Sequence, residues 1–216
     1  MPRSLPIPFP TAPDRRRFLT RCAGLALASP WLAACDPAPG IGQAQAFRGI
    51  DITGASYARD FTLTDFHGAT RHLADYRGKV VMLYFGFVQC PDVCPTALTR
   101  AAGVMQRLGA DATQLQLLFV TVDPERDTPE LLRDYLAAFH PSFVALTGSA
   151  DQIKAAADEF RAFYKKVPTG SSYTMDHTAL SYLFDRQGRV RVALRHEQTV
   201  DDYAADVQTL LAEPAA

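Results

Sequence analysis

Two stretches of almost continuous apolar residues dominate the hydrophobic pattern of the chain, at residues 80–87 and 115–122. Runs of this length and composition are typical of strands that are buried on both faces of a sheet. Shorter apolar runs predict three further strands, and the turn residues at 184–190 join the last two as a hairpin. These three strands are expected at residues 143–147, 180–185 and 190–194.

Four segments between and after these strands have helical character, and the first residues of two of them support it. Pro95 suits the first position of a helix, where the missing N–H has no acceptor in any case. Thr128-Pro129-Glu130 gives a cap, a proline and an acidic residue, the usual order at a helix start. The four helices are expected at residues 95–108, 128–139, 150–163 and 200–212.

The order of these elements predicts an α/β fold. Short segments at residues 61–63 and 71–73 suggest a small N-terminal β-hairpin, with residues 65–68 between them. The rest of the chain begins with a β-α-β unit and ends with a β-hairpin and a closing helix. This is the order of the thioredoxin fold with one inserted helix. We therefore expect a central mixed sheet flanked by helices, with the N-terminal hairpin as an extension.

The N-terminal residues 1–34 have the pattern of an export signal. Arg15-Arg16-Arg17-Phe18-Leu19 matches the twin-arginine pattern, and the apolar stretch after it is shorter than the roughly 18 residues that a membrane span needs. Leu32-Ala33-Ala34-Cys35 resembles a bacterial lipobox, which predicts lipidation of Cys35; an ordinary cleavage site with a chance cysteine is the alternative. Residues 35–50 are then a tether. Residues 51–216 form the domain, anchored by lipid to the bacterial cell membrane and facing the periplasm.

Charge argues against nucleic acid as a partner. The chain has 22 basic and 23 acidic residues, and removal of the expected signal takes away five arginines and one aspartate. The mature chain then has a net charge of −5 and no basic stripe. Removal of the signal also removes Cys22, and lipidation would occupy Cys35. Two cysteines are left for the chemistry of the domain.

These two cysteines lie in Cys90-Pro91-Asp92-Val93-Cys94-Pro95, directly after the first buried strand. A helix that began at Pro91 would contain Pro95, so we expect the helix to begin at Pro95, with Cys94 at its cap. In a regular helix, residues four apart hold their Cβ atoms ~5–6 Å apart, whereas a disulfide needs about 3.5–4.5 Å. A loop can close this gap or open around a metal ion. The cysteines are therefore a redox pair, two ligands of a soft metal, or a plain structural disulfide.

Two thiolates alone form an incomplete metal site, and His177 is the histidine best placed to complete it. It lies after a loop rich in Gly, Ser and Thr and just before the strand at 180–185. In the thioredoxin order this loop approaches the edge of the sheet that carries the cysteines. Asp176 is either a partner that orients the imidazole or a solvated acid. Two thiolates and one imidazole favour a copper ion, with zinc as the competing metal.

Together with two further segments, these residues resemble the Sco/SenC family of copper-binding, thioredoxin-like proteins of cytochrome c oxidase assembly. The resemblance implies a membrane-tethered chaperone that binds copper through Cys90, Cys94 and His177. Its implied partner is the subunit that bears the CuA centre of cytochrome c oxidase, or another copper carrier. It also places Asp123 and Asp127 near the site, although Asp123 could equally serve only to turn the chain. The likeness rests on Phe85-Gly86-Phe87, residues 90–95, residues 122–129 and Asp176-His177-Thr178.

Two catalytic alternatives stay open beside copper carriage, which is not an enzymatic function. In a thiol–disulfide oxidoreductase, Cys90 would attack a partner disulfide and Cys94 would resolve the mixed disulfide. Such an enzyme could reduce the cysteines of a copper-site partner, and His177 would be dispensable or would only tune the reaction. Peroxidase activity is the weaker alternative, because two cysteines in one short loop do not resemble the usual peroxidatic setting.

Overall fold

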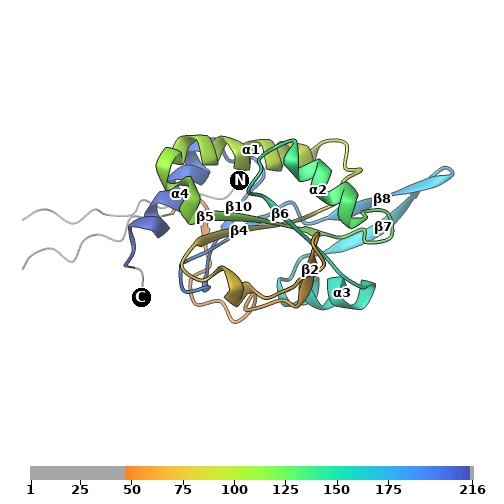
Figure 1. Ribbon diagram of the computed structural model, residues 1–216, viewed down its shortest axis with the longest axis horizontal. Helices are drawn as coiled ribbons and strands as arrows, with labels where there is room; N and C mark the ends of the chain where they lie inside the picture. Colours follow the sequence, from red (N-terminus) through yellow and green to blue (C-terminus); the bar gives the residue numbers. More distant parts are fainter. Residues whose placement is uncertain (1–46, 215–216) are drawn as a thin grey trace, which may run out of the picture. The chain divides into compact units, whose positions relative to one another are not determined.

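The computed structural model describes residues 47–214 (Figure 1). The expected export signal at residues 1–34, the expected lipidation site Cys35 and most of the expected tether at residues 35–50 lie outside these residues. None of the helices in the described part is long and apolar enough to cross a membrane.

The centre of the domain is an eight-stranded mixed sheet in the order β1-β10-β9-β4-β5-β6-β2-β3. Three strands at its middle run parallel to one another, and β9 pairs antiparallel with the first of them. All five strands expected from the apolar runs are confirmed, each to within one or two residues. They are β4 (Val80–Gly86), β5 (Leu115–Thr121), β6 (Val144–Thr147), β9 (Ser181–Phe184) and β10 (Val190–Leu194).

Short strands extend the sheet at both edges. At one edge, β2 (Leu63–Asp65) pairs with β3 (Thr70–Arg71) and also with β6. The expected N-terminal hairpin is thus present, and it is continuous with the main sheet. At the other edge, β1 (Ile50–Asp51) pairs antiparallel with β10. This strand was not predicted from the sequence, because a pair of residues is too short to show a periodic pattern.

Residues 47–214 contain four helices and two short 3-10 segments. Helices α1, α2 and α4 lie on one face of the sheet and α3 on the other (Figure 1). The side chain of Thr128 accepts a hydrogen bond from the backbone N–H of Leu131, which confirms the predicted cap of α2. Helix α3 is shorter than predicted, because Arg161 has a φ of +52° and ends it. The elements are α1 (Val93–Leu108), α2 (Pro129–Ala137), α3 (Ala150–Glu159), α4 (Val200–Ala212), η1 (Leu73–Tyr76) and η2 (Gly109–Gln114).

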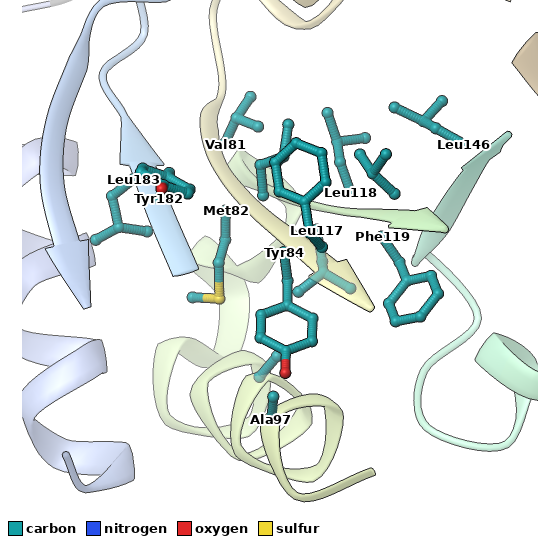
Figure 2. Close-up of a cluster of buried hydrophobic side chains, with 14 of the residues drawn as sticks. Val81, Met82, Tyr84, Ala97, Leu117, Leu118, Phe119, Leu146, Tyr182 and Leu183 are labelled. Atoms are coloured by element: carbon teal, nitrogen blue, oxygen red, sulfur yellow. The ribbon is translucent and has the colours of Figure 1, made fainter. Parts of the chain in front are cut away.

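The core lies on both faces of β4 and β5, whose residues are all buried. Side chains alternate between the faces of a strand. Met82 and Tyr84 therefore point to the helix that carries Ala97, whereas Val81 points to the opposite side (Figure 2). Burial on both faces explains why these strands read as continuous apolar runs. It also fixes the carboxyl end of β4. Residues 87–92, which we call the cysteine loop, lead from this end to α1.

A second, two-stranded sheet lies apart from the main one. It is formed by β7 (Tyr164–Thr169) and β8 (Ser172–His177), which within residues 47–214 pair antiparallel only with each other. We call this pair of strands the histidine hairpin; it extends beyond the end of the main sheet (Figure 1). The sequence was interpreted as a loop here, and that interpretation was wrong. His177 is the last residue of a strand.

Candidate metal centre

The cysteine loop connects β4 to α1, and the helix begins earlier than predicted. Asp92 is the cap and Val93 the first helical residue, so Cys94 lies in the first turn and Pro95 is the third residue of the helix. The predicted start at Pro95 was wrong for a simple reason. The first four N–H groups of a helix have no acceptor within the helix, so proline is tolerated at any position of the first turn.

Both cysteines are free thiols that are buried beneath the surface, with exposed fractions of 8% for Cys90 and 0% for Cys94. The backbone N–H of Cys94 points to the Cys90 sulfur at 3.4 Å. The hydrogen bond from the Cys94 thiol lowers the pKa of Cys90 to about 4, although burial opposes this effect. Burial raises the pKa of Cys94, and the neighbouring Cys90 adds to the rise. Both shifts act in the same sense, because they favour the thiolate form of Cys90 and the thiol form of Cys94.

His177 faces the cysteines from the end of β8. Its Nε2 atom lies 3.3 Å from the sulfur of Cys94, and its Nδ1 atom lies 3.1 Å from the carbonyl oxygen of Thr178. A carbonyl oxygen only accepts, so Nδ1 carries a proton and donates to it, which turns Nε2 toward the sulfur. The imidazole is half-buried and meets the rings of Phe87 and Tyr84 edge to face, at centroid distances of 5.7 and 5.9 Å.

The structure brings together the three side chains that the sequence singled out. Their ligand atoms, two sulfurs and one imidazole nitrogen, all lie within 4.8 Å of one another. The three residues are separated by up to 87 positions along the chain, and they come from a strand-to-helix loop, the first turn of a helix and the end of a hairpin. Two thiolates and one imidazole this close together could hold a metal ion.

Two residues beneath the cysteines were not predicted as parts of the site. A Cβ atom at Gly86 would lie 2.9 Å from the sulfur of Cys94 and 2.7 Å from the ring of Phe119, so only glycine leaves room for the thiol here. The hydroxyl of Tyr84 contacts the same sulfur at 3.9 Å. The hydrophobic pattern does not distinguish either residue from its neighbours, because both belong to a continuous buried run.

The loop of residues 122–128, which joins β5 to α2 and which we call the acidic loop, contacts the segments on both sides of the centre. Asp123, for which proximity to the site and a turn of the chain were both considered, does both. Its carboxylate is 2% exposed, accepts a hydrogen bond from the hydroxyl of Tyr173 and forms an ion pair with Arg126. Its backbone carbonyl also accepts from the N–H groups of Arg126 and Asp127, so the residue turns the chain as well. Asp176 is exposed, and the Nδ1 atom of the histidine contacts the carbonyl of Thr178 instead.

Asp127, four residues later, is buried behind the cysteine loop. Its Oδ2 atom accepts hydrogen bonds from the backbone N–H of Val88 at 3.1 Å and from the hydroxyl of Thr121 at 2.6 Å. Burial raises the pKa of this carboxyl group. The side chain thus fixes the segment that leads from β4 to Cys90. The family resemblance had implied only that Asp127 lies near the site.

Comparison with known proteins agrees with this geometry. The family model described as SCO1/SenC matches residues 51–212, which is most of the chain and includes all three candidate ligands. The chain belongs to the SCO1/SenC family. This membership confirms the resemblance that the sequence motifs indicated, and the thioredoxin-like fold is confirmed with it.

Members of the SCO1/SenC family with solved structures superpose well on the chain. ScoI of Bradyrhizobium japonicum with copper bound is 40% identical, with a TM-score of 0.66, and the match covers 71% of this chain and 98% of that one. Yeast Sco1 with copper bound is 33% identical, with a TM-score of 0.67 and coverages of 75% and 92%. A SCO2-like protein of Rickettsia prowazekii is 40% identical over 132 residues; the match covers 60% of this chain and 64% of that relative, under two thirds of its length.

Proposed function

We propose that this protein is a copper metallochaperone that holds one copper ion between Cys90, Cys94 and His177. The observation that carries the proposal is the convergence of two sulfurs and one imidazole nitrogen within 4.8 Å. Structures of relatives at 40% and 33% identity contain copper, which supports the same cargo here. The family resemblance of the motifs around these residues supports it as well.

The donor set fits copper better than the competing metal. Thiolates select Cu(I), and imidazole suits copper in either oxidation state. A structural zinc site requires four protein ligands, whereas the group found in the described part of the chain supplies three. Deprotonation of the cysteines is part of binding, and the lowered pKa of Cys90 provides one thiolate at neutral pH.

The site also suits a carrier that must release its cargo. The two sulfurs are buried, whereas the imidazole is half-buried at the end of the histidine hairpin. A ligand of the recipient can therefore approach the copper from the side of His177, displace the imidazole and then take over the ion from the thiolates. No covalent bond of the protein breaks in such a ligand exchange, so the function is transport and not catalysis.

We infer that the recipient is the CuA centre of cytochrome c oxidase or another copper carrier. The resemblance to the Sco/SenC family is the support for this recipient. The expected lipid anchor at Cys35 would hold the domain on the periplasmic face of a bacterial cell membrane, close to such a membrane-bound oxidase. The twin-arginine and lipobox patterns of the leader support this location, and nucleic acid is not among the expected partners.

A thiol–disulfide oxidoreductase is the second candidate function, and the thiolate character of Cys90 favours it. The Cys90 thiolate would attack a partner disulfide and release one partner thiolate. Cys94 would then lose its proton and attack the Cys90 sulfur, which releases the second partner thiolate. The partner gains two electrons and the cysteine pair loses them as it forms its own disulfide. In this function His177 is not required.

Copper titration of the reduced full chain separates the two functions. Wild type, Cys90→Ala, Cys94→Ala and His177→Ala would be titrated with Cu(I) without oxygen, in competition with a Cu(I) chelator. The metallochaperone predicts one equivalent in wild type and weaker binding in all three variants. Binding that His177→Ala leaves unchanged contradicts the three-ligand site and favours the oxidoreductase.

A further inference from the structure

The histidine hairpin has few ways to hold its position. Within residues 47–214, β7 and β8 form strand pairs only with each other, and they lie outside the eight-stranded sheet. An isolated two-stranded hairpin is marginally stable in water. The place of His177 at the centre must therefore depend on side chains that join the hairpin to the rest of the domain.

One face of β8 carries these side chains. Alternate residues of a strand share a face, so Tyr173, Met175 and His177 point the same way. Met175 is buried at 7% exposure, and the imidazole of His177 reaches the sulfur of Cys94. At the base of the hairpin, Thr178 and Phe163 exchange two hydrogen bonds of 2.9 Å. Tyr173, farthest from this base, is the remaining member of the inner face.

Tyr173 is attached to the acidic loop by three separate interactions. Its hydroxyl donates to Oδ1 of Asp123 at 2.9 Å. Its carbonyl oxygen accepts from Nη1 of Arg126 at 2.8 Å, and the guanidinium of the same arginine lies 3.7 Å from the centre of its ring. Arg126 also forms an ion pair with Asp123, whose carboxylate is 2% exposed. We call Asp123, Arg126 and Tyr173 the hairpin clamp.

The clamp connects the two segments that supply the ligands. Asp127, on the same acidic loop, accepts a hydrogen bond from the backbone of Val88, two residues before Cys90. The acidic loop is therefore in direct contact with the cysteine loop on one side and with the histidine hairpin on the other. A second ion pair, between Lys166 of β7 and Glu125, lies beside the clamp, but both of its side chains are exposed and it adds little.

We propose that Tyr173, held by Asp123 and Arg126, is a positioning residue that sets how strongly His177 contributes to copper binding. The proposal rests on the proposed function, because it concerns the third ligand of the same site. The clamp holds the inner face of β8 toward the cysteines, so that Nε2 is already in place when copper arrives. Without the clamp the hairpin pivots about its base at Phe163 and Thr178, and the imidazole spends less time beside the sulfurs.

A single hydroxyl tests this role. Tyr173→Phe removes the bond to Asp123 and keeps the ring beneath the guanidinium of Arg126. Tyr164→Phe is the matched control, because Tyr164 lies on the same hairpin and its hydroxyl makes no hydrogen bond within residues 47–214. Loss of a hydrogen bond to a charged group predicts a copper dissociation constant about tenfold higher for Tyr173→Phe and an unchanged one for the control.

The decisive experiment introduces Tyr173→Phe into both wild type and the His177→Ala variant and measures the affinity for Cu(I) in each. If the clamp acts through the histidine, Tyr173→Phe has no effect once His177 is gone. An equal loss in both backgrounds, or no loss in either, overturns the proposal. If His177→Ala itself leaves the affinity unchanged, the three-ligand site fails first, and the role of the clamp in copper binding fails with it.

Amide hydrogen exchange of the metal-free full chain gives a readout that does not involve copper. Tyr173→Phe should raise exchange in β7 and β8 about tenfold and leave α1 and the cysteine loop unchanged, because only the hairpin loses an attachment. Uniformly faster exchange would indicate general destabilisation and contradict a local clamp. Unchanged exchange in the hairpin would show that Tyr173 does not hold it.

Discussion

The cysteine loop and the histidine hairpin supply ligands to one centre, yet they are held in opposite ways. The loop follows β4, a central strand in which every residue is buried, and continues into α1. The hairpin is a separate two-stranded sheet in which Met175 is the one fully buried residue. Two ligands are therefore fixed by the core of the domain, and the third is fixed by one buried side chain, Met175, two aromatic contacts and a few polar contacts.

This difference suits a protein that must both hold and release a metal ion. A ligand fixed by the core can move only if the fold is disturbed, because interiors are close-packed. A ligand on a two-stranded hairpin can move at a cost of a few hydrogen bonds. We expect the thiolates to provide most of the affinity for copper and the imidazole to control access to it.

The largest expected effect comes from the cysteines. Cys90→Ala and Cys94→Ala should each raise the dissociation constant for Cu(I) by more than about a hundredfold, above the 10–100-fold that loss of an outer-shell partner costs. Competition with a Cu(I) chelator measures this. An affinity within tenfold of wild type in either variant would contradict the assignment of the thiolates as the main ligands.

The histidine should matter less than either cysteine. His177→Ala is expected to weaken Cu(I) binding by about 10–100-fold, because two thiolates still bind the ion. The free energy of unfolding of this variant in urea should differ from wild type by no more than about 0.5 kcal/mol, because the side chain of His177 is half-buried at the edge of the domain. Asp176→Asn, next to the histidine but exposed, is the control and should bind copper as wild type does. If His177→Ala lost as much affinity for Cu(I) as the cysteine variants, the distinction between the two regions would not hold.

Gly86 tests the rigidity of the cysteine side. The new Cβ atom of Gly86→Ala would overlap the sulfur of Cys94 and the ring of Phe119, both buried. Overpacking of this kind should lower the free energy of unfolding by about 1–3 kcal/mol and weaken copper binding as well. Gly103→Ala in the middle of α1, where the new Cβ would meet only the side chain of Val200 at 3.1 Å, is the control, with an expected change within about 1 kcal/mol. If Gly86→Ala is as stable as wild type, the cysteine loop is more adaptable than its packing indicates.

The smallest effect is expected at the start of α2, which follows the acidic loop. Thr128→Ala removes the hydroxyl that accepts from the N–H of Leu131 and should lower stability by about 1 kcal/mol. Copper affinity should stay the same, because the capping hydroxyl does not touch the clamp. Urea unfolding and chelator competition on the same variant measure both quantities. A fall in copper affinity would mean that the whole acidic loop, and not the clamp alone, positions the ligands.

Much of the fold could be predicted from the sequence, because its signals are local. The runs at 80–87 and 115–122 are apolar because β4 and β5 are buried on both faces. Thr128 caps a helix because its hydroxyl reaches an N–H three residues later. The three candidate ligands were also found, since soft ligand types are rare in the chain and their positions follow from the order of the elements.

The histidine hairpin could not be predicted so easily. Pro168 and two lysines in β7, followed by Gly170 in the turn, resemble a loop, and the strand was missed. The available signal was the alternation in β8, where Tyr173 and Met175 point inward and polar residues lie between them. The strand has six residues, too few for the alternation to be decisive. The clamp depends on contacts between residues 47 and 50 positions apart, which no local pattern can show.

X-ray absorption at the copper edge identifies the atoms that bind the metal. The reduced full chain would be loaded with one equivalent of Cu(I), and the scattering atoms around the metal would be counted in wild type and His177→Ala. We predict two sulfurs and one imidazole nitrogen around the copper in wild type, and two sulfurs without the nitrogen in the variant. Sulfur-only coordination in both proteins would contradict this prediction, because the histidine hairpin would then supply no ligand.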